Sequence, residues 1–346
     1  MKLYIKKDFL VFLLVSIFFA CIVGNRGNTN DTSVYYDIFK NIDVYDINSY
    51  SNFYIQTGVE LGWGLYSKLL SFFVTGSFIL FFVFSFFTFF VIYKTNKILN
   101  INYLYSLVFY LPSGFFLMQQ FMQIRQGLAV PAVILASLLY LTNHKKQSIL
   151  FFILAILFHQ IAFAYILVFF FYLVLEKKYP IGYSLNRFYF VLIGILIFGF
   201  IMARNVILPL ASTFFDRLTS YANSDYAEDV GFFSLSNVKF YLEFFLILLL
   251  TNKRLLADKL YVFMVFIFTI GLTLRIAFYD FGILSGRLSN VFLFIEVFLI
   301  PYVISQRFEK KYFYLFLLVY FILIFYVTWV YQAGPFLQDS YFMPLE

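Results

Sequence analysis

The sequence predicts an all-α protein that crosses a membrane many times. Of its 346 residues, 63% are hydrophobic, 24% are aromatic and 12% are charged, and a water-soluble core could not bury so much apolar material. The apolar residues form long runs with short positive clusters between them. About eleven membrane-spanning helices are therefore expected, some of them short. They lie at about 9–24, 68–93, 101–118, 121–142, 148–159, 161–175, 188–209, 238–252, 260–278, 290–305 and 312–331.

The lysines predict which helix ends face the cytoplasm, because cytoplasmic loops of membrane proteins are enriched in Lys and Arg. Two short passes between the lysine pairs at 145–146 and 177–178 keep both pairs inside, so we expect a break near His159 and Gln160. With a cytoplasmic amino terminus and an uncleaved first helix, thirteen of the sixteen cytoplasmic Lys and Arg residues are lysine. Six of the nine external ones are arginine, namely Arg26, Arg125, Arg204, Arg217, Arg275 and Arg287.

The external arginines indicate an anionic, phosphate-bearing substrate, because guanidinium groups bind phosphate bidentately and this side is normally poor in positive charge. We expect a single integral membrane domain over 1–346, with external loops at about 25–67, 211–238 and 279–289. The short cytoplasmic loops leave no room for a nucleotide-binding domain. The net charge of +7 follows the positive-inside pattern and does not indicate nucleic acid, and the single cysteine predicts neither a disulfide nor a metal site.

The strongest local signal is the polar stretch 119–127, which lies between two apolar runs. It holds four glutamines and Arg125, and Gln119, Gln123 and Gln126 are spaced to share one face of a helix. The arginine suits a phosphate, and the amides suit sugar hydroxyls. A solvated turn is the alternative, although the stretch lacks the Asn, Asp, Ser or Pro residues typical of turns.

Other candidate residues lie in or beside the apolar runs. His159 is interpreted as a base, as a donor to a phosphate oxygen, or as a buried residue that holds two helices together. Glu60 is a carboxylate at the interface, and nearby Trp63 is interpreted as a sugar-stacking platform or an interfacial anchor. Asp31 and Arg26 follow the first span, where they either receive a headgroup or belong to ordinary helix caps.

The carboxyl-terminal half supplies the remaining arginines. Arg287, near a helix amino terminus with small hydroxylated neighbours, is a candidate anion site. Arg275 is a candidate for substrate binding, but a buried ion pair with Glu296 or Glu243 is the favoured interpretation. Two further arginines are interpreted as catalytic groups or as interfacial charges that meet lipid headgroups, namely Arg204 and Arg217.

In their order along the chain, these elements resemble the EpsG-like family of exopolysaccharide and O-antigen (Wzy-type) polymerases. The resemblance covers nearly the whole chain, although its motifs are short. The loop at 211–238, which contains Arg217, is more acidic than the arginine-bearing loop of some Wzy polymerases. The residues that carry the resemblance are Asp31-Thr32, Glu60-Leu61-Gly62, Arg125-Gln126, Phe158-His159 and Arg287.

The resemblance implies a GT-C-like polymerase/ligase architecture and a glycosyltransferase of the bacterial inner membrane with an external active site. The enzyme would move a glycan from polyprenyl pyrophosphate to the non-reducing end of another lipid-linked repeat unit. Arg125 and Arg287 would clamp the pyrophosphate, and His159 would be the base or an added donor. Asp31 or Glu60 would position the acceptor or share the base role.

No cofactor and no metal are implied, because arginines can neutralise a pyrophosphate. The expected partners are the undecaprenyl-pyrophosphate-linked oligosaccharide, membrane lipids, a chain-length regulator and a flippase. Three alternatives stay open at this point. They are an O-antigen ligase-like transferase that uses a similar donor, a flippase or transporter of lipid-linked oligosaccharide, and an acyltransferase that modifies the glycan.

Overall fold

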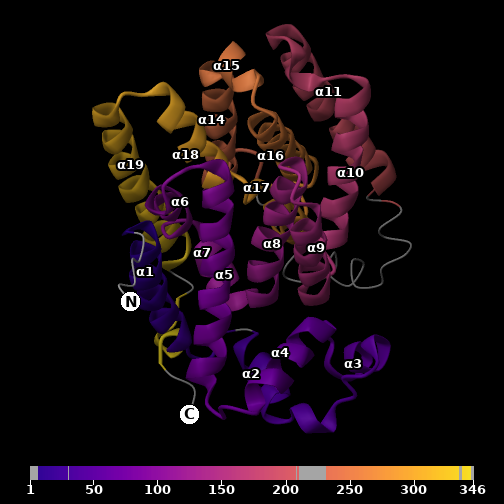
Figure 1. Ribbon diagram of the computed structural model, residues 1–346, viewed down its shortest axis with the longest axis vertical. Coiled ribbons are helices and arrows are strands. Elements are labelled where there is room, and N and C mark those ends of the chain that lie inside the picture. Colours follow the sequence, from indigo (N-terminus) through magenta and orange to yellow (C-terminus); the bar gives the residue numbers. More distant parts are fainter. Residues whose placement is uncertain (1–6, 30, 208, 210–230, 335–336, 344–346) are drawn as a thin grey trace, which may run out of the picture. The chain divides into compact units, whose positions relative to one another are not determined.

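The computed structural model describes residues 7–29, 31–207, 209, 231–334 and 337–343, and the regular elements within them are helices (Figure 1). The all-α prediction is confirmed. The chain divides into two compact units, Met1–Phe163 with Tyr314–Glu346, and Ala164–Phe313. They are called unit 1 and unit 2. The single membrane domain expected from the sequence stays a prediction.

Six helices in the described part of the chain are long and apolar enough to cross a membrane, and the polytopic prediction is confirmed. A seventh candidate is a pair of helices, α17 and α18, bent by 40° at a short break. The six are α1 (Lys7–Gly24), α5 (Ser77–Leu99), α8 (Ile124–Leu141), α11 (Leu185–Met202) with a π-helical extension, α16 (Lys259–Ala277) and α19 (Lys310–Phe325) with another.

Helices occupy the other predicted spans too, but they are short. The expected span 101–118 is divided into α6 (Tyr103–Tyr110) and α7 (Gly114–Leu117). The remaining three are α9 (Lys145–Phe158), α10 (Ala162–Lys178) and α14 (Leu235–Leu250), with 14, 17 and 16 residues. The predicted break near His159 is confirmed, whereas a total of eleven spans stays a prediction.

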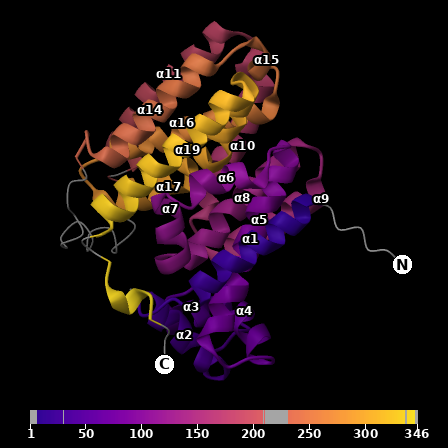
Figure 2. The ribbon, with the colours of Figure 1, turned by 90° about the vertical axis from the view of Figure 1, so that its left-hand side faces the viewer.

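In unit 1, α8 is buried along most of its length and packs against α5 and α9. Helix α1 lies along α5 through aromatic contacts, in which the rings of Phe12 and Tyr93 stack with centroids 4.4 Å apart. Figure 2 shows α1 and α5 side by side. The rings of Phe109 and Tyr320 join α6 to α19, with their centroids 4.2 Å apart. The core of this unit therefore combines the aliphatic side chains of α8 with aromatic contacts between the surrounding helices.

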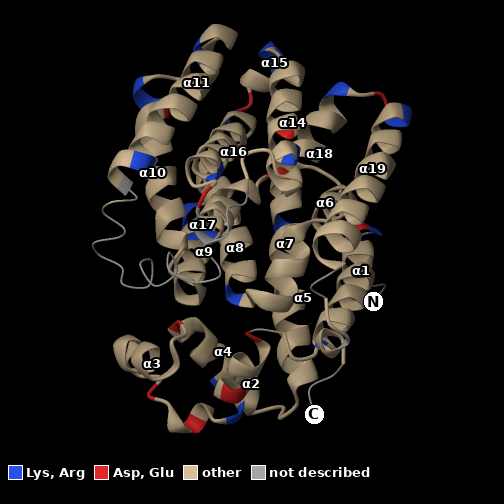
Figure 3. Cartoon of the chain, turned by 180° about the vertical axis from the view of Figure 1, so that it is seen from behind, with Lys and Arg blue, Asp and Glu red and all other residues tan. Residues whose placement is uncertain are grey.

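The segment expected as the external loop 25–67 forms short helices, which we call the helical cap. The cap consists of α2 (Thr32–Lys40), the 3-10 turn η1 (Ile42–Val44), α3 (Tyr50–Thr57) and α4 (Leu61–Ser71). Since α4 ends at Ser71 and α5 begins at Ser77, the predicted start of the second span at 68 was wrong. Charged residues gather in the cap and at helix ends, while the long helices are largely uncharged (Figure 3).

Unit 2 is built around α16, whose side chains are mostly buried. It packs against α11, α14, α17 (Gly282–Leu293) and α18 (Glu296–Arg307), with the short α15 (Lys253–Leu256) before it. Most of the expected external loop 211–238 lies outside the described residues, and so does Arg217.

The segment near the carboxyl terminus docks on the chain that leaves α1. The backbone N–H of Gly27 donates to the carbonyl of Tyr341 at 2.7 Å, and that of Asn28 donates to Ser340 at 2.9 Å. A Cβ atom on Gly27 would overlap the carbonyl oxygens of Ser340 and Met343. Glycine at position 27 therefore permits this contact by having no side chain.

We expect Gly27→Ala to displace the segment around Ser340, because the added methyl occupies the space of two backbone oxygens and overpacking of this kind costs about 1–3 kcal/mol. Limited proteolysis of purified protein with a carboxyl-terminal tag measures this as faster loss of the tag. The control is Gly194→Ala in α11, where a Cβ meets nothing within 4 Å. Equal cleavage rates for both variants would contradict the prediction.

Candidate functional site

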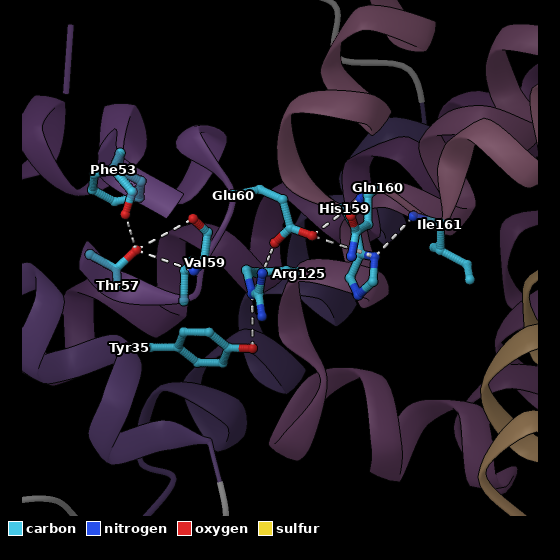
Figure 4. A network of polar contacts seen from close by, with 9 residues as sticks. All are labelled: Tyr35, Phe53, Thr57, Val59, Glu60, Arg125, His159, Gln160 and Ile161. Carbon is cyan, nitrogen blue, oxygen red and sulfur yellow. Dashed lines mark hydrogen bonds and ion pairs between the residues drawn. The ribbon is translucent and has the colours of Figure 1, made fainter. Parts of the chain in front are cut away.

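Three predicted site residues of unit 1 meet in one cluster, although they are far apart in the sequence (Figure 4). Glu60 precedes α4, Arg125 lies in the first turn of α8, and His159 follows the end of α9. An oxygen of the Glu60 carboxylate, Oε2, forms an ion pair with Arg125 Nη1. The other, Oε1, lies 3.8 Å from Nδ1 of His159. The side chain of Glu60 is 2% exposed, so this carboxylate is buried.

A tight turn between α3 and α4 directs Glu60 into the cluster. Gly58 closes α3 in the left-handed conformation, with φ at 68°. Thr57 Oγ1 donates to the carbonyl of Phe53 at 2.7 Å and accepts from the N–H of Val59 at 3.1 Å. The position of Glu60 is thus fixed by hydrogen bonds within the preceding stretch 53–59.

A second glycine allows the cap to approach the break at His159. A Cβ on Gly62 would meet the carbonyl oxygen of Leu157 at 2.5 Å. This close approach of α4 to the end of α9 lets Glu60 Oε1 accept the backbone N–H of Gln160 at 3.2 Å. The interruption between α9 and α10 therefore supplies a free backbone donor to the buried carboxylate.

Arg125 is positioned by a change of helix type. A π-helix, η2 (Met118–Met122), precedes it, and Gln123 leaves helical geometry with φ at −94° and ψ at 56° before α8 begins. Nε of Arg125 donates to the hydroxyl of Tyr35 at 3.0 Å. Its side chain is 15% exposed. A helix amino terminus also favours negative charge, so both the backbone and the guanidinium suit an anion.

The prediction that three glutamines share one helical face is wrong. Because the chain passes from a π-helix through Gln123 into α8, Gln119, Gln123 and Gln126 do not share one face of an α-helix. Gln119 and Gln126 are buried, and their binding of sugar hydroxyls stays a prediction. The fourth glutamine, Gln120, is structural, since it accepts from Ser85 Oγ at 2.7 Å and donates to another buried hydroxyl.

His159 has extended backbone geometry, with φ at −159° and ψ at 125°, and ends α9. The backbone N–H of Ile161 donates to its Nδ1 at 3.2 Å. In the neutral ring Nδ1 is therefore the acceptor, and the proton is on Nε2. This tautomer makes His159 a hydrogen-bond donor through Nε2 and favours the donor role over the base role.

Tyr35 belongs to the cluster, although no role is predicted for it from the sequence. It is 2% exposed, and burial raises the pKa of its hydroxyl while the neighbouring Arg125 opposes this effect. It stays protonated and fixes the orientation of the guanidinium. Asp31 lies one turn before it in the chain and is half-buried. The spacing of four residues between Asp31 and Tyr35, which suits one helix face, was the signal that could have identified it.

Arg26 is buried beside the cap and lacks partners for part of its guanidinium. It is 1% exposed, its Nε donates to the carbonyl of Val23 at 3.2 Å, and it lies 4.2 Å above the ring of Phe81. Nη1 and Nη2 are buried and have no hydrogen-bond partner among the described residues. Burial lowers the pKa of Arg26 to about 9, so it is still charged at neutral pH. A buried cation without a partner is costly unless water or an anion meets it.

Trp63 is a core residue, and both predictions for it were wrong. It is fully buried, its ring packs against those of Tyr66, Phe81 and Phe84, and its Nε1–H donates to the carbonyl of Tyr35 at 3.3 Å. A ring enclosed on its faces cannot stack on a sugar or lie in the bilayer interface. It instead holds the cap against α5.

Two arginines of unit 2, Arg204 and Arg275, have partners in the protein. Arg204 pairs with Asp280 at 2.7 Å. Arg275 is 7% exposed and donates from Nε to Asn237 Oδ1 at 2.6 Å. The buried ion pair of Arg275 with Glu296 or Glu243 stays a prediction. Lys239 of α14 pairs with both carboxylates. Its Nζ lies 2.5 Å from Glu296 Oε1 and 3.8 Å from Glu243 Oε1. From the sequence it was expected only as an external charge.

Arg287 is exposed and lies in the second turn of α17. It belongs to unit 2, whereas Arg125 belongs to unit 1. Their convergence on one pyrophosphate therefore stays a prediction. The cluster that the structure does bring together consists of Glu60, Arg125, His159 and Tyr35, with Arg26 nearby in the same unit.

Comparison with known proteins gives one result. A family model described as the EpsG family matches residues 9–345, nearly the whole chain. No curated protein and no solved structure matches it.

We expect Arg125→Ala to lower the free energy of unfolding by about 3–5 kcal/mol, because it leaves the Glu60 carboxylate buried without its cation. Adding Glu60→Gln removes that charge and should recover most of the loss. Denaturant titration in detergent micelles measures both effects. Arg307→Ala, at an exposed position, is the control and should change stability by no more than about 0.5 kcal/mol. If the double variant Arg125→Ala with Glu60→Gln is as unstable as Arg125→Ala alone, the stability of the cluster does not depend on the Glu60–Arg125 ion pair.

Proposed function

We propose that this chain, which belongs to the EpsG family, transfers a glycan from polyprenyl pyrophosphate to the non-reducing end of another lipid-linked repeat unit. The family consists of membrane proteins of the polysaccharide-polymerase type. The proposed glycan transfer rests on one observation. The Arg125 guanidinium is held by the buried carboxylate of Glu60, beside His159, which can donate a hydrogen bond. This arrangement suits a diphosphate whose negative charge grows as its bond to the sugar breaks.

The proposed step balances without a further reactant. A hydroxyl of the acceptor sugar attacks the anomeric carbon of the donor, and a new C–O bond forms. The bond between the anomeric carbon and the pyrophosphate oxygen breaks, and its electron pair leaves with the polyprenyl pyrophosphate. The hydroxyl proton passes to a base, for which Asp31 is the proposed group, because the carboxylate of Glu60 is already engaged by Arg125.

Each residue of the cluster has a distinct part in this step. Arg125 binds a phosphate oxygen with the part of its guanidinium that Glu60 and Tyr35 do not hold, and His159 adds a hydrogen bond from Nε2. Glu60 and Tyr35 are positioning residues, since they act on the substrate only through Arg125. Arg26 is proposed as a second cation for the substrate, because its Nη atoms have no partner within the described chain. Arg287 is proposed as the other half of the pyrophosphate clamp.

The proposed location is the bacterial inner membrane, with the cluster at the external face. In unit 1, Lys7 lies at the start of α1 and Lys97 in the last turn of α5, whereas the cap follows the end of α1. Helix α1 has 18 residues and is about 27 Å long. The lysines that flank these two long helices therefore lie at the end of the unit opposite the cluster, which supports an external site. A chain-length regulator and a flippase are proposed as partners.

We expect Arg125→Lys to abolish polymer while single lipid-linked repeats accumulate. Lysine keeps the charge for Glu60 but loses the planar fork that binds a phosphate, and loss of such a donor costs about 100-fold or more. Gel banding of surface polysaccharide measures the polymer, and an immunoblot checks the protein level. Arg307→Lys is the matched control.

Wild-type chain length in Arg125→Lys would refute the assignment of the cluster. A deletion strain tests the activity itself. A polymerase deletion leaves single repeats on the surface, whereas a ligase deletion accumulates long lipid-linked polymer. Loss of even the single repeats from the outer leaflet would instead indicate a flippase.

Variants of His159 distinguish a donor from a base. Glutamine keeps an N–H donor at about the reach of Nε2 but cannot take up a proton. We expect His159→Gln to retain polymerisation within about tenfold of wild type and His159→Ala to lose about 100- to 1,000-fold, as on removal of one oxyanion donor. If His159 is the base, both variants fall equally. Polymer formed per unit time from isolated membranes supplied with lipid-linked repeats is the measurement.

A further inference from the structure

Unit 1 contains a cavity at the end opposite the Glu60–Arg125–His159 cluster. Its volume is about 440 Å³, and it lies between the start of α1, the end of α5 and the start of α6. We propose that this cavity binds the phosphodiester headgroup of an anionic phospholipid from the cytoplasmic leaflet. The polar residues that line it include Lys7, Asp8, Tyr93, Asn96, Asn100 and Tyr103.

The wall of the cavity holds a hydrogen-bond donor that the protein does not use. Asn96 is 1% exposed, and its Oδ1 accepts from Ser106 Oγ at 2.6 Å. The other atom of the amide, Nδ2, is a hydrogen-bond donor. Nδ2 is buried and has no hydrogen-bond partner among the described residues. A buried donor of this kind is costly unless it is satisfied, and an oxygen of a phosphate is a strong acceptor.

The charges around the cavity favour an anion. Lys97 Nζ pairs with Asp8 Oδ2 at 2.9 Å, which neutralises both side chains. Lys7, which is exposed at the rim, is then the excess positive charge of the lining. A lysine and an unused amide donor in one lining suit a phosphate oxygen, whereas a cation would meet a net positive lining.

The surroundings favour a lipid over a free phosphate ion. Exposed apolar side chains continue from the cavity along α1, at Phe9, Leu10 and Leu14. On the other side Leu104 lines the cavity and is 40% exposed. Acyl chains of a lipid whose headgroup lies in the cavity would cover these side chains. A soluble phosphate would leave them unused.

The cavity and the proposed catalytic cluster lie at opposite ends of unit 1. Helix α5 has 23 residues and is about 34 Å long, slightly more than the hydrocarbon core of a bilayer. The cavity lies where α5 ends, beside Lys97, and the cap precedes its start. The proposed lipid is thus bound at the opposite membrane face and is not a reactant of the glycosyl transfer.

The test uses the full-length protein in nanodiscs of equimolar phosphatidylglycerol and phosphatidylcholine. Lipids that stay bound after release into the gas phase are identified by native mass spectrometry. We expect wild type to retain phosphatidylglycerol in several-fold preference over phosphatidylcholine. Asn96→Asp keeps the acceptor for Ser106 but replaces the unused donor with a carboxylate. It should abolish the preference, and Lys7→Gln should reduce it several-fold.

Lys94→Gln is the matched control, because Lys94 is exposed on the same helix and does not line the cavity. It should retain the wild-type preference. The proposal is overturned if wild type shows no preference or if Lys94→Gln lowers it as much as Lys7→Gln does. It is also overturned if inorganic phosphate binds and displaces phosphatidylglycerol at equal concentration. Polymer formation should persist in Lys7→Gln, so failure here and failure of the proposed transferase activity are distinguishable.

Discussion

The buried carboxylate of Glu60 is the constraint on which the candidate site depends. A charge removed from water must be paired and hydrogen-bonded, or it destabilises the fold by several kcal/mol. In this protein the partners are the guanidinium of Arg125 and the backbone N–H of Gln160. They come from the start of α8 and from the break after α9. Satisfying this one carboxylate therefore fixes the relation of three chain segments, and the two glycines at 58 and 62 make that approach sterically possible.

The positive charges expected on the external side fall into two physical classes. Arg204 and Lys239 are paired with carboxylates in unit 2, so their charge is compensated inside the protein. Arg26 in unit 1 is buried with two nitrogens that lack hydrogen-bond partners in the described part of the chain. The excess of external arginine is thus not one functional set. The buried, uncompensated guanidinium is the one that structural requirements alone do not explain, and it lies in the same unit as the cluster.

Much of the architecture was accessible from the sequence because hydropathy and lysine distribution act locally. The helices and the break near His159 followed from such signals, and Arg125 and Glu60 stood out as polar residues beside apolar runs. The packing of Trp63 did not, because an aromatic residue near a span has the same local pattern whether it faces lipid or the core. The cap was also missed, since its short helices carry the polar composition of a loop.

Contacts between distant segments were inaccessible for a different reason. Helices that are apolar all round have no amphipathic face from which a partner can be inferred. Lys239 illustrates this limit: as a single charge at the start of an apolar helix it resembles a topology marker, yet it holds carboxylates from α14 and α18. Likewise, the glutamine spacing predicted one face only because regular α-helical geometry was assumed across Gln123. The π-helix before it changes the direction of each later side chain, and that change is what turns Arg125 toward Glu60 rather than along the row of amides.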